Sequence, residues 1–198
     1  HPEAHFARAQ AAAVAEDPLE GLAAIDGALA LHPDWEPAVL LKTQLLQQAN
    51  AGREALRLID AFLGQRPDSR NARLTRARLL VAQQQFEEAR SEFRTLLDGA
   101  PGDRDLNYAV ALLSAQLNDL DDAERLFTAA LEAGHPDASA IRLNLAQIAE
   151  RRNDIDAALA HYAAIGGSEH ALQARVLLML EIAGGAPALF ERVARAPD

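Results

Sequence analysis

Residues 70–101, RNARLTRARLLVAQQQFEEARSEFRTLLDGAP, decide how this chain is expected to fold. The first half of the stretch predicts a helix over roughly residues 72–83, and the second half predicts one over roughly residues 86–97. A short polar turn separates them. The same pattern of small and large residues recurs before and after this stretch. Such a chain stacks neighbouring helix pairs instead of folding around one central core.

Equivalent residues recur at a period of 34 positions, as the prolines Pro33, Pro67 and Pro101 show. One column of small residues, with a single residue inserted before its last member, contains Gly21, Ala55, Ala89, Ala123 and Ala158. A second small column contains Ala9, Thr43, Ala77, Ala111 and Ala146. A large apolar column contains Ile25, Ile59, Phe93, Phe127 and Tyr162. Small residues belong where helices cross closely and large ones belong one turn further along, so these columns predict the interhelical packing.

This helix–turn–helix unit, with its small, Ala-x3-Phe and terminal proline positions, resembles the tetratricopeptide repeat. The resemblance covers about residues 3–170. It implies an all-α, right-handed solenoid that forms a single array over residues 1–198. Five helix pairs and a partial sixth are expected at residues 3–33, 36–67, 70–101, 104–136, 139–166 and 171–195. The chain departs from the family at the early aromatic position, which holds His5, Val39, Arg73, Asn107 and Arg142.

Segments 146–154 and 158–162, followed by Gly166 and Gly167, are also similar to long proteobacterial tetratricopeptide proteins. Some of those proteins are outer-membrane lipoproteins that act as adaptors and bring substrates to periplasmic proteases. This resemblance implies a bacterial adaptor, and it favours the cell envelope or periplasm over the cytoplasm. Eighteen arginines against a single lysine, Lys42, also indicate a bacterial source.

Composition and charge argue against several classes of function. The net charge of −10 predicts that the chain binds neither nucleic acid nor anionic membranes. No apolar window of about 18 residues occurs, so no segment is expected to insert into a membrane. No two histidines have metal-ligand spacing on one helix, and neither an HExxH motif nor a glycine-rich phosphate loop occurs. We therefore expect no enzyme activity, no cofactor and no metal.

The tetratricopeptide resemblance implies that the first helix of each pair lines a concave face. The family's groove position, the fifth of each unit, is apolar throughout: Phe6, Leu40, Leu74, Tyr108 and Leu143. The ninth position holds Gln10, Gln44, Arg78, Leu112 and Gln147. An apolar ribbon bordered by amides predicts a site for an extended or helical peptide, because apolar anchors supply binding energy and glutamines satisfy the backbone. The alternative is that the fifth-position residues pack between adjacent first helices.

Arginines are concentrated on the first helix of the third unit. Arg70, Arg73 and Arg76 are three residues apart and form one stripe, whereas Arg78 is directed toward the groove. The stripe could dock an acidic segment of a partner. Alternatively, its members pair with acidic neighbours of the chain itself or form a solvated face.

One known function of the family can be tested on the groove positions. Tetratricopeptide co-chaperones hold the acidic C-terminal tail of heat-shock chaperones with a clamp of Lys, Asn and Arg. The first three units place Phe6, Gln10, Leu41, Leu74 and Arg78 at those positions, and only Arg78 matches. No other register fits better, so we do not expect this function.

The sequence therefore predicts a non-catalytic scaffold or adaptor that binds a protein or peptide partner on its concave face. A second hypothesis is a structural module that self-associates through its terminal repeats. It is motivated by the apolar helix expected around residues 176–180, because terminal repeats need a polar cap. A third hypothesis is a regulatory domain of a larger multidomain protein.

Overall fold

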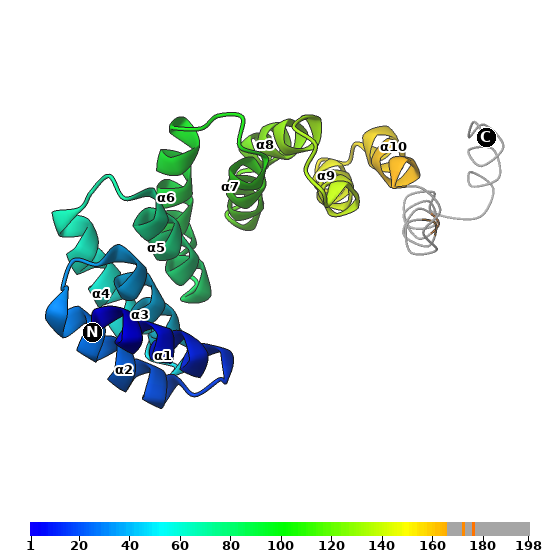
Figure 1. Ribbon diagram of the computed structural model, residues 1–198. Helices are drawn as coiled ribbons and strands as arrows, with labels where there is room; N and C mark the ends of the chain where they lie inside the picture. The colour runs from blue at the N-terminus through cyan, green and yellow to red at the C-terminus, as the bar shows by residue number, and fades with distance from the viewer. Residues whose placement is uncertain (166–171, 173–175, 177–198) are drawn as a thin grey trace. The chain divides into compact units, whose positions relative to one another are not determined.

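The computed structural model describes residues 1–165 together with Leu172 and Val176 (Figure 1). This described part contains helices and turns and no strand. The helices are α1 (Pro2–Val14), α2 (Pro18–Leu31), α3 (Glu36–Gln48), α4 (Gly52–Gln65), α5 (Arg70–Ala82), α6 (Phe86–Asp98), α7 (Arg104–Gln116), α8 (Leu120–Glu132), α9 (Ala138–Arg151) and α10 (Ile155–Ala164). Each odd-numbered helix packs against the helix that follows it. The predicted all-α solenoid of about five helix pairs is confirmed.

Each turn within a helix pair contains one non-glycine residue with a positive φ, between 56° and 63°. These residues are Glu16, Asn50, Gln84, Asn118 and Asn153. Asparagine suits this left-handed conformation better than other residues with a Cβ, because its short polar side chain bonds locally. The turns therefore follow the same repeat as the helices that they connect.

Side chains at the helix starts determine where several helices begin. Asp17, Ser69 and Asp154 each accept a hydrogen bond from the backbone N–H three residues later. Asp103 accepts from two N–H groups of α7. Pro18 occupies the first turn of α2, where its missing N–H leaves no hydrogen bond unmade. These groups satisfy donors that a helix N-terminus leaves without internal partners.

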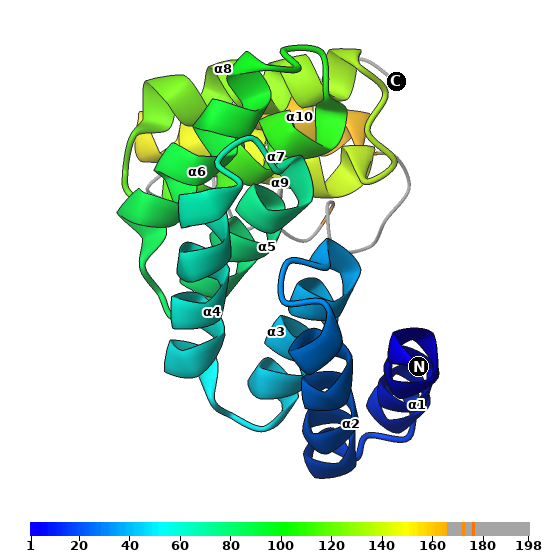
Figure 2. The same ribbon diagram turned by 60° about the vertical axis from the view of Figure 1, so that its left-hand side comes forward.

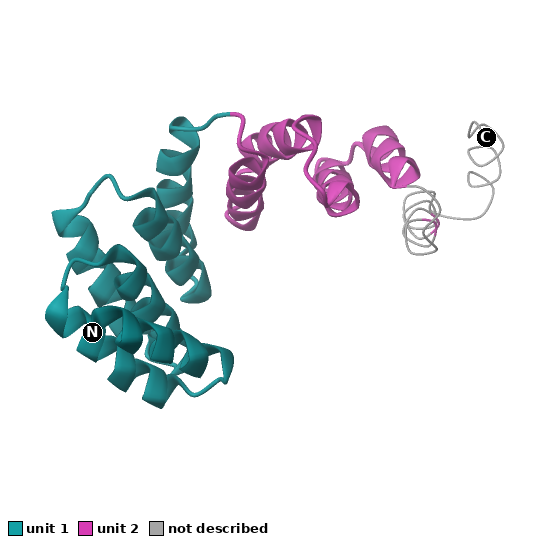
Figure 3. Cartoon of the chain, in the orientation of Figure 1, with its two compact units in different colours: residues 1–101 teal, residues 102–198 magenta. Residues whose placement is uncertain are grey.

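The chain divides into two compact units, which Figure 3 shows in teal and magenta: unit 1, residues 1–101, and unit 2, residues 102–198. In unit 1, α2 packs on α3 and α4 packs on α5, which places the first helices side by side. Accordingly, α1 contacts α3 and α3 contacts α5. Figure 2 shows α1, α2 and α3 from a second side. In unit 2, α8 packs on α9.

Two expectations about the array as a whole are not tested by this structure. The single right-handed array over residues 1–198 stays a prediction, because each unit is defined by itself. The partial sixth pair expected at residues 171–195 lies outside the described residues except for Leu172 and Val176.

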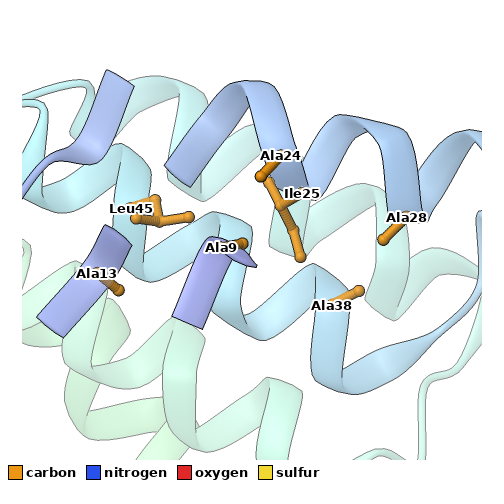
Figure 4. Close-up of a cluster of buried hydrophobic side chains, with 7 residues drawn as sticks. All are labelled: Ala9, Ala13, Ala24, Ile25, Ala28, Ala38 and Leu45. Carbon is orange, nitrogen blue, oxygen red and sulfur yellow. The ribbon is translucent and has the colours of Figure 1, made fainter. Parts of the chain in front are cut away.

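The repeat columns form the core of both units. The two small columns are buried throughout: Ala9, Thr43, Ala77, Ala111 and Ala146, and Gly21, Ala55, Ala89, Ala123 and Ala158. The large apolar column is buried as well. Figure 4 shows how residues of three helices meet in unit 1: Ala9 comes from α1, Ala24 and Ile25 come from α2, and Ala38 and Leu45 come from α3. The periodicity thus predicted these packing residues correctly.

Candidate peptide-binding groove

In unit 1, residues of the helices α1, α3 and α5 line an open hollow of about 470 Å³. This hollow, the unit 1 groove, is lined by Phe6, Gln10, Pro37, Leu40, Leu41, Gln44, Gln47, Thr75 and Arg78. Its volume lies within the range of about 300–1,000 Å³ that is typical of ligand sites. Five of the six groove residues expected in the first three helix pairs line it together. The sixth, Leu74, is half-buried and is not part of the lining.

The fifth and ninth positions share one face of each first helix, because residues four apart lie one turn from each other. Phe6 and Leu40, at the fifth position, are half-buried. Gln10, Gln44 and Arg78, at the ninth, are exposed. The groove therefore has an apolar floor and a polar border.

The inner sides of the fifth-position residues pack between helices. The ring of Phe6 lies 4.7 Å from that of Trp35, centroid to centroid, and both rings pack against the buried cluster of Figure 4. Leu40 packs against a second cluster, which includes Val39 and Ile59. Interhelical packing and groove lining are thus not exclusive alternatives, because one half-buried side chain does both.

Polar groups in the unit 1 groove have free hydrogen-bonding capacity. The side-chain amides of Gln10, Gln44 and Gln47 make no hydrogen bond to any residue that the structure describes. The Arg78 guanidinium likewise has no ion-pair partner within the described part of the chain. No acidic side chain belongs to the lining. The groove therefore presents amide donors and acceptors and one positive charge.

The arginine stripe is engaged differently from Arg78. The Arg76 Nε donates to Oδ1 of Asp60 at 2.6 Å, and its Nη1 donates to Oε1 of Glu92 at 2.7 Å. Arg73 donates to Glu92 at 3.4 Å and to the backbone carbonyl of Pro67 at 2.9 Å. Although burial lowers the pKa of Arg76, its bonds to both carboxylates and their charges raise that pKa above its ordinary value. These contacts favour internal pairing for Arg73 and Arg76, and acidic docking on Arg70, Arg73 and Arg76 stays a prediction.

Unit 2 holds the remaining groove candidates, which do not line the unit 1 groove. The half-buried ring of Tyr108 lies 4.5 Å from His135 and 5.9 Å from Phe127, centroid to centroid. Burial and the charge of Asp137 raise the pKa of the Tyr108 phenol. Leu112, Leu143 and Gln147 are exposed. The ring contacts account for one side of Tyr108, and the groove role of all four unit 2 residues stays a prediction.

The described residues provide neither a metal site nor a membrane-spanning helix. No group of three or more His, Asp or Glu side chains lies close enough to hold a metal ion there. No helix in the same part of the chain is both long and apolar enough to cross a membrane.

Sequence comparison supports the tetratricopeptide resemblance. Two profiles described as tetratricopeptide repeats match residues 46–113 and 108–169. This chain belongs to the tetratricopeptide repeat family. A search of curated proteins found no match.

Solved structures share the fold of this chain at low sequence identity. MamA from residue 41 onward, from Desulfovibrio magneticus RS-1, aligns with a TM-score of 0.74 and 16% identity over 83% of this chain and 92% of that one. A tetratricopeptide repeat protein from Parabacteroides merdae ATCC 43184 aligns with a TM-score of 0.77 and 18% identity over 100% and 80%. At these identities the likeness establishes the fold alone.

Membership of the family gives the general class of function. Tetratricopeptide repeat proteins are generally non-catalytic interaction modules, and membership of the family supports a general role for this chain as a protein–protein interaction scaffold. Four lining residues lie outside the fifth and ninth positions on which the sequence prediction of the groove was based: Pro37, Leu41, Gln47 and Thr75. Leu41 and Thr75 both occupy the sixth position of the repeat, so a search of that column would have found them.

Proposed function

We propose that this tetratricopeptide array binds an extended segment of a protein partner in the unit 1 groove. The observation that supports the proposal is the composition of the groove. Apolar side chains form its floor, and three glutamine amides without a described partner line it. The hypotheses of a self-associating module and of a regulatory domain stay predictions.

The glutamines favour an extended segment over a helical one. Every non-proline residue of a peptide carries one N–H and one C=O, and these need partners when the peptide is buried. A bound helix satisfies its own backbone, whereas an extended segment does not. The amides of Gln10, Gln44 and Gln47 can donate to and accept from such a backbone.

Apolar side chains of the segment would supply most of the binding energy. The outer sides of Phe6, Leu40 and Leu41 lie in the lining of the groove and are covered by no other described residue. Burying apolar surface against them is favourable by roughly 25 cal/mol for each Å² removed from water. We therefore expect the segment to place one apolar side chain beside Phe6 and another beside Leu40.

A displayed library of random peptides tests the proposal. Peptides of about twelve residues can span three neighbouring first helices in extended form. After selection on the wild-type chain, each peptide's affinity is measured by fluorescence anisotropy. Leu40→Glu should weaken binding at least about tenfold, because a buried carboxylate would face apolar anchors.

The matched control is Leu19→Glu, since Leu19 is 76% exposed on α2 and lies outside the groove. This control should bind as the wild type does, and circular dichroism should show equal helicity in all three proteins. Selected peptides that bind Leu40→Glu and wild type equally would refute the groove as the binding surface.

A further inference from the structure

We infer that the segment bound in the unit 1 groove carries an acidic side chain that pairs with Arg78. The inference rests on the proposed function and adds the chemistry of the partner. Arg78 is the only charged residue among the nine that line the groove. Its guanidinium is exposed and has no hydrogen-bond or ion-pair partner in the described part of the chain.

Two other arginines of α5 form ion pairs with acidic side chains of the same chain. Arg73 and Arg76, on the same helix, are paired with Glu92, and Arg76 is also paired with Asp60. Arg78 lies on the groove side, where the lining supplies no carboxylate. The carboxylate that would complete this site must therefore come from the partner.

Removal of water from the Arg78 guanidinium makes the groove selective for an acidic residue. An apolar segment that covers the groove removes water from the guanidinium of Arg78, and removing a charge from water is unfavourable unless the charge is paired. A carboxylate that forms a bidentate pair with arginine offsets this cost. A basic side chain at the same place would be repelled. The groove therefore selects an acidic residue at one position of an otherwise apolar or neutral segment.

The packing of the helices sets the spacing within that segment. Phe6 lies on α1 and Arg78 lies on α5, and α3 contacts both of these helices. Packed helix axes are about 8–10 Å apart, so the two side chains are roughly 16–20 Å apart across the groove. An extended chain advances about 3.3 Å per residue. The acidic residue should consequently stand about five or six residues from the apolar residue that contacts Phe6.

The experiment uses a library whose peptides are fused at their C-termini, so that only a side chain can provide the carboxylate. Selected peptides are synthesised with amidated C-termini, and their affinities are measured for wild type, Arg78→Gln and Arg53→Gln. Arg53 is an exposed arginine of α4 outside the groove, and Arg53→Gln makes the same change of charge.

We expect the peptides to share an Asp or Glu at the stated spacing from an aromatic or aliphatic residue. Arg78→Gln should weaken binding by about tenfold, and Arg53→Gln should leave it unchanged. Exchanging the peptide's acid for arginine should abolish binding to wild type. Arg78→Glu should restore binding of that exchanged peptide.

The results separate this inference from the proposed function. Suppose that the peptides bind wild type and that Leu40→Glu weakens this binding, but that the peptides lack the acid and bind Arg78→Gln with unchanged affinity. The inference about Arg78 is then wrong, whereas the proposed peptide binding in the groove is supported. If no peptide is selected, or if Leu40→Glu weakens none of them, both are overturned.

Discussion

Replacing Gly21 with alanine should destabilise unit 1, although alanine occupies the same column of the other four helix pairs. A Cβ at Gly21 would lie 2.5 Å from Cδ2 of Leu45 and 3.0 Å from its Cδ1. Carbon atoms in ordinary contact are about 3.5–4.0 Å apart. Leu45 is fully buried, so its side chain has no solvent to turn into.

Two opposing effects set the size of the change. Alanine is favoured over glycine inside a helix by about 1 kcal/mol. Overpacking a well-filled core costs about 1–3 kcal/mol, because side chains leave their rotamers or helices move apart. The contact to Cδ2 of Leu45 would be too short by about 1 Å or more, so the cost of overpacking should prevail. We expect Gly21→Ala to lower the free energy of unfolding by about 1 kcal/mol.

Urea unfolding measures this change in unit 1 directly. Trp35 is the only tryptophan of the chain and belongs to unit 1, so its fluorescence follows the unfolding of that unit. The control is Gly64→Ala, because a Cβ at Gly64 meets nothing within 4 Å. This second variant lies in the last turn of α4 and should gain about 0.5 kcal/mol.

A double mutant tests the cause of the effect. Leu45→Ala should itself cost about 2–5 kcal/mol, because it leaves a cavity. In that background the clash is gone, so Gly21→Ala should become stabilising by about 1 kcal/mol. The reasoning would be refuted if Gly21→Ala stabilised the otherwise wild-type chain, or if its effect were the same in both backgrounds.

Two further predictions concern the turns and the tyrosines. Gln84→Asn should raise the free energy of unfolding of unit 1 by roughly 0.5 kcal/mol in the same fluorescence assay. The reason is that Gln84 has a φ of 61°, a conformation that asparagine tolerates better. Gln83→Asn, at a residue outside the left-handed region, should bring no such gain. The chain's two tyrosines should ionise above pH 10 in the folded protein and near pH 10 in urea, as followed by phenolate absorbance. Burial and then the 2.6 Å hydrogen bond from Tyr162 to Glu150 raise the pKa of Tyr162, so the unfolded chain loses its proton first and stability should fall above pH 10 by up to about 1.4 kcal/mol per pH unit. A native titration step near pH 10 for both phenols would contradict this.

The helix pairs and their core could be predicted from the sequence because the packing residues recur at fixed spacings along the chain. Small residues such as Ala55 and large ones such as Ile59 return at one period, and both prove to be fully buried. The fifth and ninth positions were predicted to share a face for the same local reason, since one helical turn separates them. Phe6 and Leu40 accordingly meet in one groove.

Only the tertiary structure decided which side chains are available within that pattern. Leu74 has the sequence signature of a groove residue, yet it is not part of the lining. The spacing of Arg73 and Arg78 placed them on different faces of one helix, but it did not show that Arg73 is paired with Glu92 and that Arg78 is not. These outcomes depend on contacts with side chains of other helices, which are distant in the sequence. The repeat period does not show which residues those side chains contact. The sequence by itself therefore determined the helix pairs and their buried columns, whereas packing between helices decided which polar and apolar groups remain open to a partner.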